Sequence, residues 1–173
     1  MQREEIQALI KRFGGQNVTT RNIRVERSGN DSPKAIITTE LPADVFDWER
    51  FDIIREVMLM DGMVMPMNRS QVPLLDTHSR WSIKDQLGSV SNFSDVTIAG
   101  YRGKLGVPNF SSVPDAQEAK TKVDEGHVTD LSVGYEVLES TWIPARTKQT
   151  VGGREYDGGE NGLKVTTQWK LKE

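Results

Sequence analysis

The stretch "GHVTDLSVGYEV", residues 126–137, constrains the fold most, because its apolar and polar side chains alternate with a period of two. One face of the predicted strand carries Leu131, Val133, Tyr135 and Val137, and the other carries Val128, Asp130, Ser132, Gly134 and Glu136. On the second face, the hydroxyl of Ser132 lies between the carboxylate of Asp130 and Gly134. An ordinary solvent-facing strand could have the same composition, so this stretch alone leaves the role of Ser132 open.

Short strands recur along the chain, and helices are few. Alternation and turn residues predict strands over residues 17–29, 34–41, 55–62, 95–105 and 163–173. Helical spacing predicts helices over 3–13 and 112–126, the second with Pro114 in its first turn and Gly126 just past its end. Residues 42–52 fit a short helix or a loop, and residues 147–162 fit a flexible loop or a long hairpin tip. We therefore expect a β-rich α+β protein, a closed or nearly closed β-barrel with few helices.

Composition limits the functions that are open to the chain. With 173 residues, of which 36% are hydrophobic and 27% charged, it suits one soluble domain. A net charge of −3 gives no electrostatic reason to expect binding to nucleic acid or to an anionic membrane. No apolar run reaches the roughly 20 residues of a membrane span, and the first residues lack the form of a signal peptide, so a cytosolic protein is expected.

Metal and redox sites are disfavoured as well. The absence of cysteine excludes disulfides and thiolate ligands, and the two histidines, His78 and His127, are too few for a histidine metal centre. The carboxylates do not follow the spacing of a calcium loop. The sequence predicts no metal site.

A serine becomes a nucleophile only when a base takes its proton, and histidine is the natural base. His127 lies five residues before Ser132, an odd spacing that puts it on the opposite face of a common strand. His78 could reach Ser132 only through the fold, and a lone histidine in a polar segment is often just a surface residue. Gly134 shares the Ser132 face and could let a substrate backbone bind close to the hydroxyl, although a glycine could equally ease a bend.

The serine does not lie in the nucleophile elbow of α/β-hydrolases. Asp130 stands where the first glycine of a Gly-x-Ser-x-Gly motif would be. The serine is instead expected within a strand, which excludes the commonest hydrolase fold.

Several blocks of the sequence, in this order, resemble those of a known family. The blocks are "VPLLDTHSR", "LGSV", "DAQEAKTKVDEGHVTDLSVGYEV" and "TQWKLKE". They resemble the prohead protease family of tailed phages, which shares the barrel fold of the herpesvirus assemblins. The resemblance covers residues 34–173 and leaves residues 1–33 outside it, as an N-terminal helix and an extended segment.

The resemblance implies a catalytic triad. The family's Leu-Leu-x-x-His block places the base at His78, and its Leu-Ser-x-Gly-Tyr block places the nucleophile at Ser132. The third member, a carboxylate in a tryptophan-led strand, falls on Glu173, where the assemblins have a second histidine. Asp157, in the glycine-rich segment, and Asp130, on the strand of the serine itself, are weaker alternatives for the third member.

The family's pattern continues after this strand with a Ser-Leu-Val strand, whereas this sequence ends at Glu173. The resemblance therefore implies that the C-terminal strand is truncated and that catalysis by this form is slow. The donors of an oxyanion hole are not identified by the resemblance.

The implied function is that of a serine endopeptidase in prohead maturation. Its substrates would be the phage scaffold protein, the major capsid precursor and the protease itself, inside a prohead assembling in the bacterial cytoplasm. The resemblance implies no cofactor and allows a homo-oligomer. Two alternatives remain: a non-catalytic assembly module of the same fold that binds capsid precursor, and a hydrolase of carbohydrate or lipid.

Overall fold

The computed structural model describes residues 19–26, 34–66, 69–128 and 130–173, and the side chains of 19–26 and 130–132 lie outside this description. The predicted helix over 3–13 also lies outside the described residues. The described elements are the strands β1 (Thr19–Glu26), β2 (Lys34–Thr39), β3 (Ala43–Asp47), β4 (Asp52–Met58), β5 (Met63–Val64), β6 (Val72–Leu75), β7 (Gln86–Ile98), β8 (Tyr101–Phe110), β9 (Asp130–Ile143), β10 (Lys148–Val151), β11 (Arg154–Asp157) and β12 (Leu163–Leu171), the helix α2 (Pro114–Asp124), and the 3-10 turns η1 (Met60–Gly62) and η2 (Ile83–Asp85).

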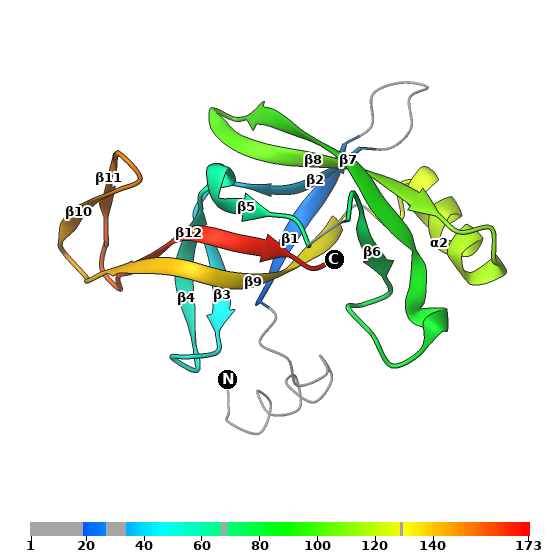
Figure 1. Ribbon diagram of the computed structural model, residues 1–173, viewed down its shortest axis with the longest axis horizontal. Helices are drawn as coiled ribbons and strands as arrows, with labels where there is room; N and C mark the ends of the chain where they lie inside the picture. Colours follow the sequence, from blue (N-terminus) through cyan, green and yellow to red (C-terminus); the bar gives the residue numbers. More distant parts are fainter. Residues whose placement is uncertain (1–18, 27–33, 67–68, 129) are drawn as a thin grey trace.

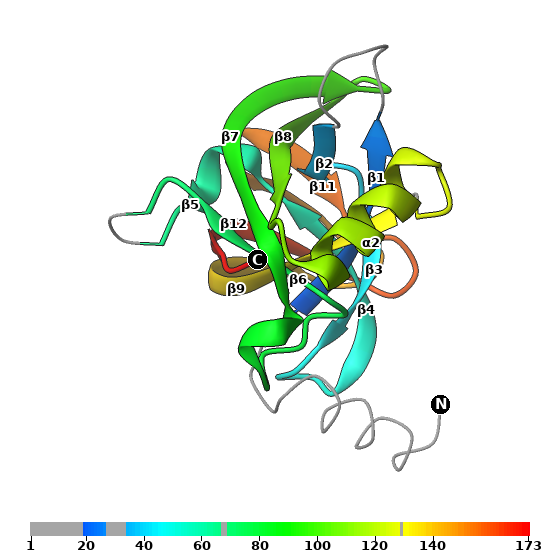
Figure 2. The ribbon, with the colours of Figure 1, turned by 90° about the vertical axis from the view of Figure 1, so that its right-hand side faces the viewer.

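One 10-stranded sheet dominates the fold and curls into a half-barrel (Figures 1 and 2). Its strand order is β3-β4-β12-β9-β1-β2-β8-β7-β6, with β5 paired to β12. The prediction of a β-rich protein is confirmed. A closed barrel would join β3 to β6, and no ladder does so within the described ranges, so the prediction of a closed barrel is wrong.

The edge position of β6 has a cause in its sequence. This strand has four residues, and its second residue is Pro73, which has no backbone N–H to donate to a further neighbour. Its other edge pairs with β7 from Val72 to Leu75. A strand of this kind ends a sheet.

The C-terminal strand β12 lies at the centre of the fold. It pairs antiparallel with β9 and parallel with both β4 and β5. Trp169 of this strand is fully buried. Its Nε1 donates to the carbonyl of Leu59 at 2.9 Å, and its ring packs edge-on against Tyr135. The main core around it consists of Ala35, Ile36, Ile37, Met58, Met60, Val72, Leu74, Val90, Val133, Tyr135, Trp169 and Leu171.

A carboxylate is buried in this core between two hydroxyl groups. Glu56 of β4 is fully buried, accepts a hydrogen bond from Thr166 Oγ1 at 2.6 Å, and accepts another from the hydroxyl of Tyr135. Buried acceptors are costly unless they are satisfied. The two hydroxyls therefore tie β4, β9 and β12 to one another.

The helix and the hairpin agree with expectation. α2 begins at Pro114, buries Ala116 and Val123, and is followed by Gly126 at a φ of 83°. A positive φ is readily adopted by glycine, so the chain can turn there toward β9. The glycine-rich segment forms the β10–β11 hairpin, which projects at one end of the molecule (Figure 1).

Residues 42–52, expected as a short helix or a loop, form a strand and a turn instead. β3 pairs antiparallel with β4, and Asp47 at its end accepts hydrogen bonds from the backbone N–H groups of Glu49 and Arg50. Among the described residues, no helix has both the length and the apolar character needed to cross a membrane.

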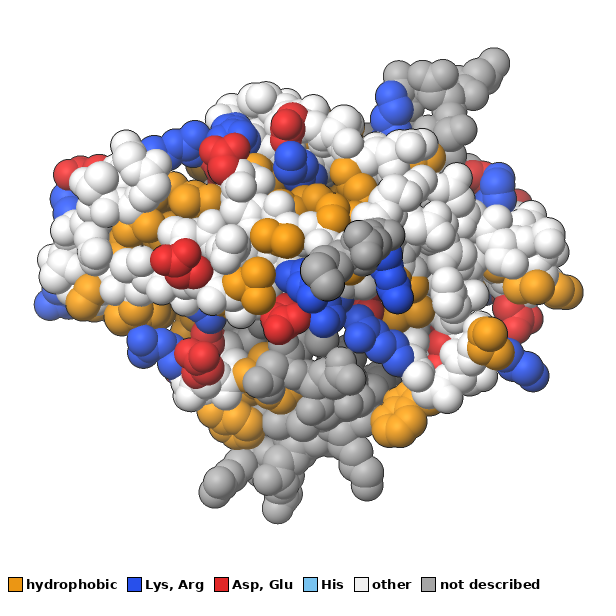
Figure 3. Space-filling model, in the orientation of Figure 1, with side chains coloured by type: hydrophobic (Ala, Val, Ile, Leu, Met, Phe, Trp, Pro, Cys, Tyr) orange, Lys and Arg blue, Asp and Glu red, His pale blue; other side chains and the backbone are white. Residues whose placement is uncertain are grey.

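The face of the molecule shown in Figure 3 is the one on which β12 ends. Lys and Arg side chains gather near its middle. This local excess of positive charge contrasts with the net charge of −3 of the whole chain.

Candidate active site

The structure brings His78 and Glu173 together across 95 residues of sequence. His78 lies in the turn after β6, and Glu173 lies just beyond the end of β12. Nδ1 of His78 is 3.1 Å from Oε1 of Glu173, and the two side chains are only 13% and 4% exposed. The contact is possible because the sheet curls, so that the end of the edge strand β6 lies close to the end of β12.

The turn that holds His78 has an unusual backbone. Thr77 and His78 have φ values of 48° and 57°, and Ser79 N–H donates to the carbonyl of Asp76 at 2.8 Å, as in a type I′ turn. Such turns favour glycine and asparagine. For other residue types, a positive φ costs about 1–3 kcal/mol. The surrounding structure must compensate for this cost.

Asp85 supplies part of that compensation. Its Oδ2 accepts from Ser79 Oγ at 2.5 Å and from the backbone N–H of Ser82 at 2.9 Å, and its own carbonyl accepts from Asp76 N–H at 2.8 Å. These hydrogen bonds lower the pKa of Asp85. The ionised carboxylate therefore fastens the His78 turn to the start of β7.

Arg80 binds the second oxygen of Glu173, a contact that sequence reasoning missed. Its Nε lies 2.7 Å from Oε2, and its Nη2 contacts the same oxygen. Burial raises the pKa of Glu173, but the hydrogen bonds from His78 and Arg80 outweigh it, so the pKa lies below its usual value. Glu173 is thus an ionised carboxylate held from both sides near neutral pH.

Gly134 lies against Glu173. Its N–H donates to the Glu173 carbonyl at 3.1 Å, and its own carbonyl accepts from Lys172 N–H at 2.9 Å. A Cβ at position 134 would lie 2.5 Å from Oε1 and 2.8 Å from Cγ and Cδ of Glu173. The glycine therefore leaves room for the carboxylate, a function that the sequence did not suggest, while substrate binding at Gly134 stays a prediction.

Gly134→Ala is expected to lower kcat/KM by about tenfold to 10²-fold, because the new methyl group displaces Glu173 from His78 and Arg80. Steady-state kinetics of the single and double variants measure the effect. In a Glu173→Gln background the same change should have little further effect, since the two residues act through one contact. A full additional loss in that background would mean that Gly134 acts on the substrate instead.

Ser132 is placed by its backbone alone. It pairs with Asn22 of β1 and stands two residues before Gly134 on β9, a distance of about 7 Å along a strand. Its side chain lies outside the description, as does that of Asp130. A hydrogen bond between Ser132 and His78 therefore stays a prediction.

The other candidates lie elsewhere. His127 precedes β9 instead of lying on it, so the expectation of a common strand with Ser132 is wrong; it is 71% exposed and pairs with Glu125 at 3.3 Å. Asp157 is on the β10–β11 hairpin, where Oδ1 accepts from Gly159 N–H at 2.8 Å. The hairpin projects away from the part of the sheet that carries His78 (Figure 1).

A cavity of about 720 Å³ adjoins His78 and Glu173. Its apolar wall includes Ile37, Leu74, Val90, Val133 and Leu171, and Glu118 and Lys122 of α2 line another part. Ligand sites of this size are usually apolar clefts with a few polar groups. The cavity thus offers apolar surface beside the histidine–carboxylate pair.

Replacing Arg80 with methionine is expected to raise the pKa of Glu173, to lower the stability at neutral pH and to make that stability less dependent on acid. A depressed folded pKa contributes stability above the usual value of 4.5, and this contribution is lost as the pH falls through the lower folded pKa. Without Arg80 the folded pKa lies closer to the unfolded value, so this contribution is smaller and less stability should be lost as the pH falls. Urea unfolding as a function of pH tests this. The control is Arg146→Met, which removes an exposed pair with Glu160. The same dependence of the free energy of unfolding on acid pH in wild type and both variants would contradict the prediction.

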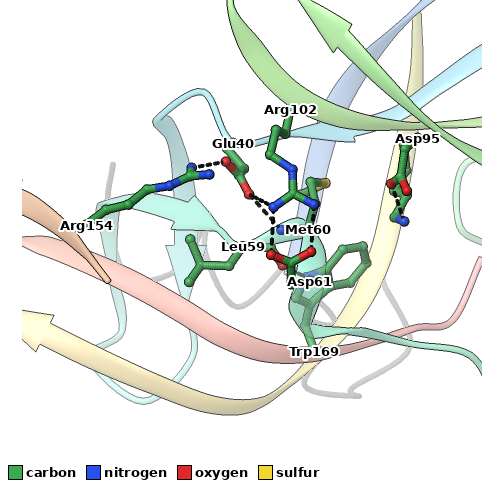
Figure 4. A network of polar contacts seen from close by, with 9 residues as sticks. Glu40, Leu59, Met60, Asp61, Asp95, Arg102, Arg154 and Trp169 are labelled. Carbon is green, nitrogen blue, oxygen red and sulfur yellow. Dashed lines mark hydrogen bonds and ion pairs between the residues drawn. The ribbon is translucent and has the colours of Figure 1, made fainter. Parts of the chain in front are cut away.

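A second charged cluster, around Glu40, is structural (Figure 4). Glu40 is buried and accepts from Met60 N–H at 3.1 Å and from Arg154 Nη1 at 2.5 Å. Arg102 lies 3.8 Å from the same carboxylate and binds both oxygens of Asp61 at 2.6 Å. These contacts join β8, β11 and η1, and they occupy the carboxylates that a catalytic role would need.

Within the part of the chain that the structure describes, no group of three or more His, Asp or Glu side chains could hold a metal ion. No protein-family model matches the chain, and no significantly similar curated protein or solved structure was found.

Proposed function

We propose that the protein is a serine endopeptidase with Ser132 as nucleophile, His78 as general base and Glu173 as the carboxylate that orients the histidine. The observation that carries the proposal is the contact of His78 with Glu173 beside the strand of Ser132. The resemblance of the sequence blocks to prohead proteases of tailed phages, and through them to the assemblin fold, supports the same assignment.

The mechanism follows from which ring nitrogen is engaged. Because Nδ1 of His78 faces Glu173, Nε2 is the nitrogen that takes the proton from Ser132 Oγ as the oxygen attacks the peptide carbonyl. The tetrahedral intermediate collapses when His78 returns the proton to the leaving amine. Water then releases the acyl group by the same steps in reverse. Glu173 stabilises the imidazolium form in both halves.

The proposed substrates are proteins of the assembling phage head: scaffold, major capsid precursor and the protease itself, within the bacterial cytoplasm. An apolar cavity beside the site suits the side chain of a peptide better than a small polar metabolite. No metal or cofactor enters the proposed reaction.

A fluorophosphonate probe on the full chain tests the nucleophile. Wild type and Ser140→Ala, which removes an exposed serine from the same strand, should be labelled, whereas Ser132→Ala and His78→Ala should not. Labelling that persists in Ser132→Ala would refute the assignment. An unlabelled wild type that still binds capsid precursor would favour the non-catalytic assembly module.

A further inference from the structure

A groove of about 530 Å³ lies next to the candidate active site. We call it the basic groove and define it by the basic side chains Arg69, Arg80, Lys170 and Lys172 and the apolar side chains Trp81 and Ile83. We propose that the basic groove binds an extended segment of the protein substrate in which acidic side chains alternate with apolar ones. This rests on the proposed function, because it assigns the groove to the same substrate.

The charge of the groove indicates an acidic ligand. Among the residues that the structure describes, its lining includes four basic side chains and no acidic one, in a chain whose net charge is −3. Arg80 and Lys172 already bind Glu173 and Glu136. For Arg69 and Lys170, by contrast, no ion pair to another described side chain occurs, so a ligand carboxylate would be their partner.

The apolar surface of the groove indicates that charge alone is not what it recognises. Trp81 is 76% exposed and Ile83 is 90% exposed, both in the loop between the His78 turn and β7. Large apolar side chains this open to water commonly mark a binding surface when they cluster. A nucleic acid would use the charges, but an aliphatic side chain such as Ile83 offers its bases and phosphates little.

The groove and the active-site cavity are neighbours. Pro73 and Leu75 of β6 line both, and the turn residue His78 and its neighbour Arg80 stand on the two sides of Glu173. A peptide in the groove would therefore lie beside the His78–Glu173 pair. The groove would bind residues that flank the cleaved bond and so contribute to specificity.

Binding can be measured without cleavage, using the full chain with Ser132→Ala. The probe is a fluorescein-labelled peptide containing Leu-Glu-Leu-Glu, compared with Leu-Gln-Leu-Gln and Ser-Glu-Ser-Glu versions by fluorescence anisotropy. We expect the first to bind at least about tenfold more tightly than either, and to weaken as salt is raised. Arg69→Glu with Lys170→Glu should weaken its binding by about tenfold or more.

The matched control is Lys34→Glu with Arg55→Glu, which changes the net charge equally at exposed strand positions outside the groove. It should alter binding by less than about twofold, and circular dichroism checks that both double variants fold. Equal losses in the two double variants, no binding at all, or tighter binding of single-stranded DNA than of the peptide would overturn the proposal. Because the assay needs no nucleophile, failed fluorophosphonate labelling would count against the proposed function and not against the groove.

Discussion

His78→Ala is expected to lower kcat/KM for a capsid-precursor peptide by about 10²–10⁴-fold, the usual contribution of a general base. Of the two histidines, it is the one that lies against a buried carboxylate, and its turn keeps it there at a cost in backbone energy. The loss is measured as the rate of peptide cleavage, monitored by chromatography, or as the rate of self-processing.

The matched control is His127→Ala, which removes the other histidine of the chain. His127 is exposed and pairs with Glu125, so its loss should leave cleavage within about twofold of wild type. Equal losses from the two replacements would show that His78 is not the base.

Trp169→Ala is expected to destabilise the fold by about 3–5 kcal/mol, because it opens a large cavity at the centre of the core. Trp169 is fully buried, and its ring centroid lies 6.1 Å from that of Tyr135 at an interplanar angle of 75°. It also anchors β12, the strand that leads to Glu173. Urea denaturation monitored by circular dichroism gives the free energy of unfolding.

Trp169→Phe separates packing from hydrogen bonding. Phenylalanine keeps much of the apolar volume but loses the Nε1 donor, and the carbonyl of Leu59 still accepts from Gly62 N–H at 3.1 Å. The loss should therefore be much smaller than with alanine. Equal losses would mean that the hydrogen bond, and not the packing, stabilises this part of the core.

Local sequence patterns predicted several elements because their causes are local. The alternation around Val133 and Tyr135 reflects one buried face of β9, and both side chains are buried as expected. Pro114 marks the start of α2 because proline fits the first turn of a helix. β3 was missed because it is only five residues long and runs straight into a turn, where Phe46 packs on both Trp48 and Phe51.

The candidate site could be predicted only through the resemblance. Nothing local relates His78 to Glu173, since the contact depends on where β6 and β12 lie in the sheet. Arg80 was missed because an arginine in a polar loop has no distinctive pattern. The positive φ of Thr77 and His78 was also hidden, because neither residue is glycine or asparagine, the residues that mark such a turn in a sequence. The open sheet is likewise a result of tertiary pairing, although Pro73 gives the β6 edge one local cause.

The central position of β12 bears on when the site is completed during synthesis. β12 joins β4, β5 and β9, all made earlier, and such non-local pairing forms slowly because long loops must close first. His78 and Ser132 leave the ribosome before Glu173 does, so a nascent chain presents the histidine and the serine without their carboxylate. Under the proposed function, a new chain gains full activity only after β12 has docked, and neighbouring nascent chains are spared from premature cleavage.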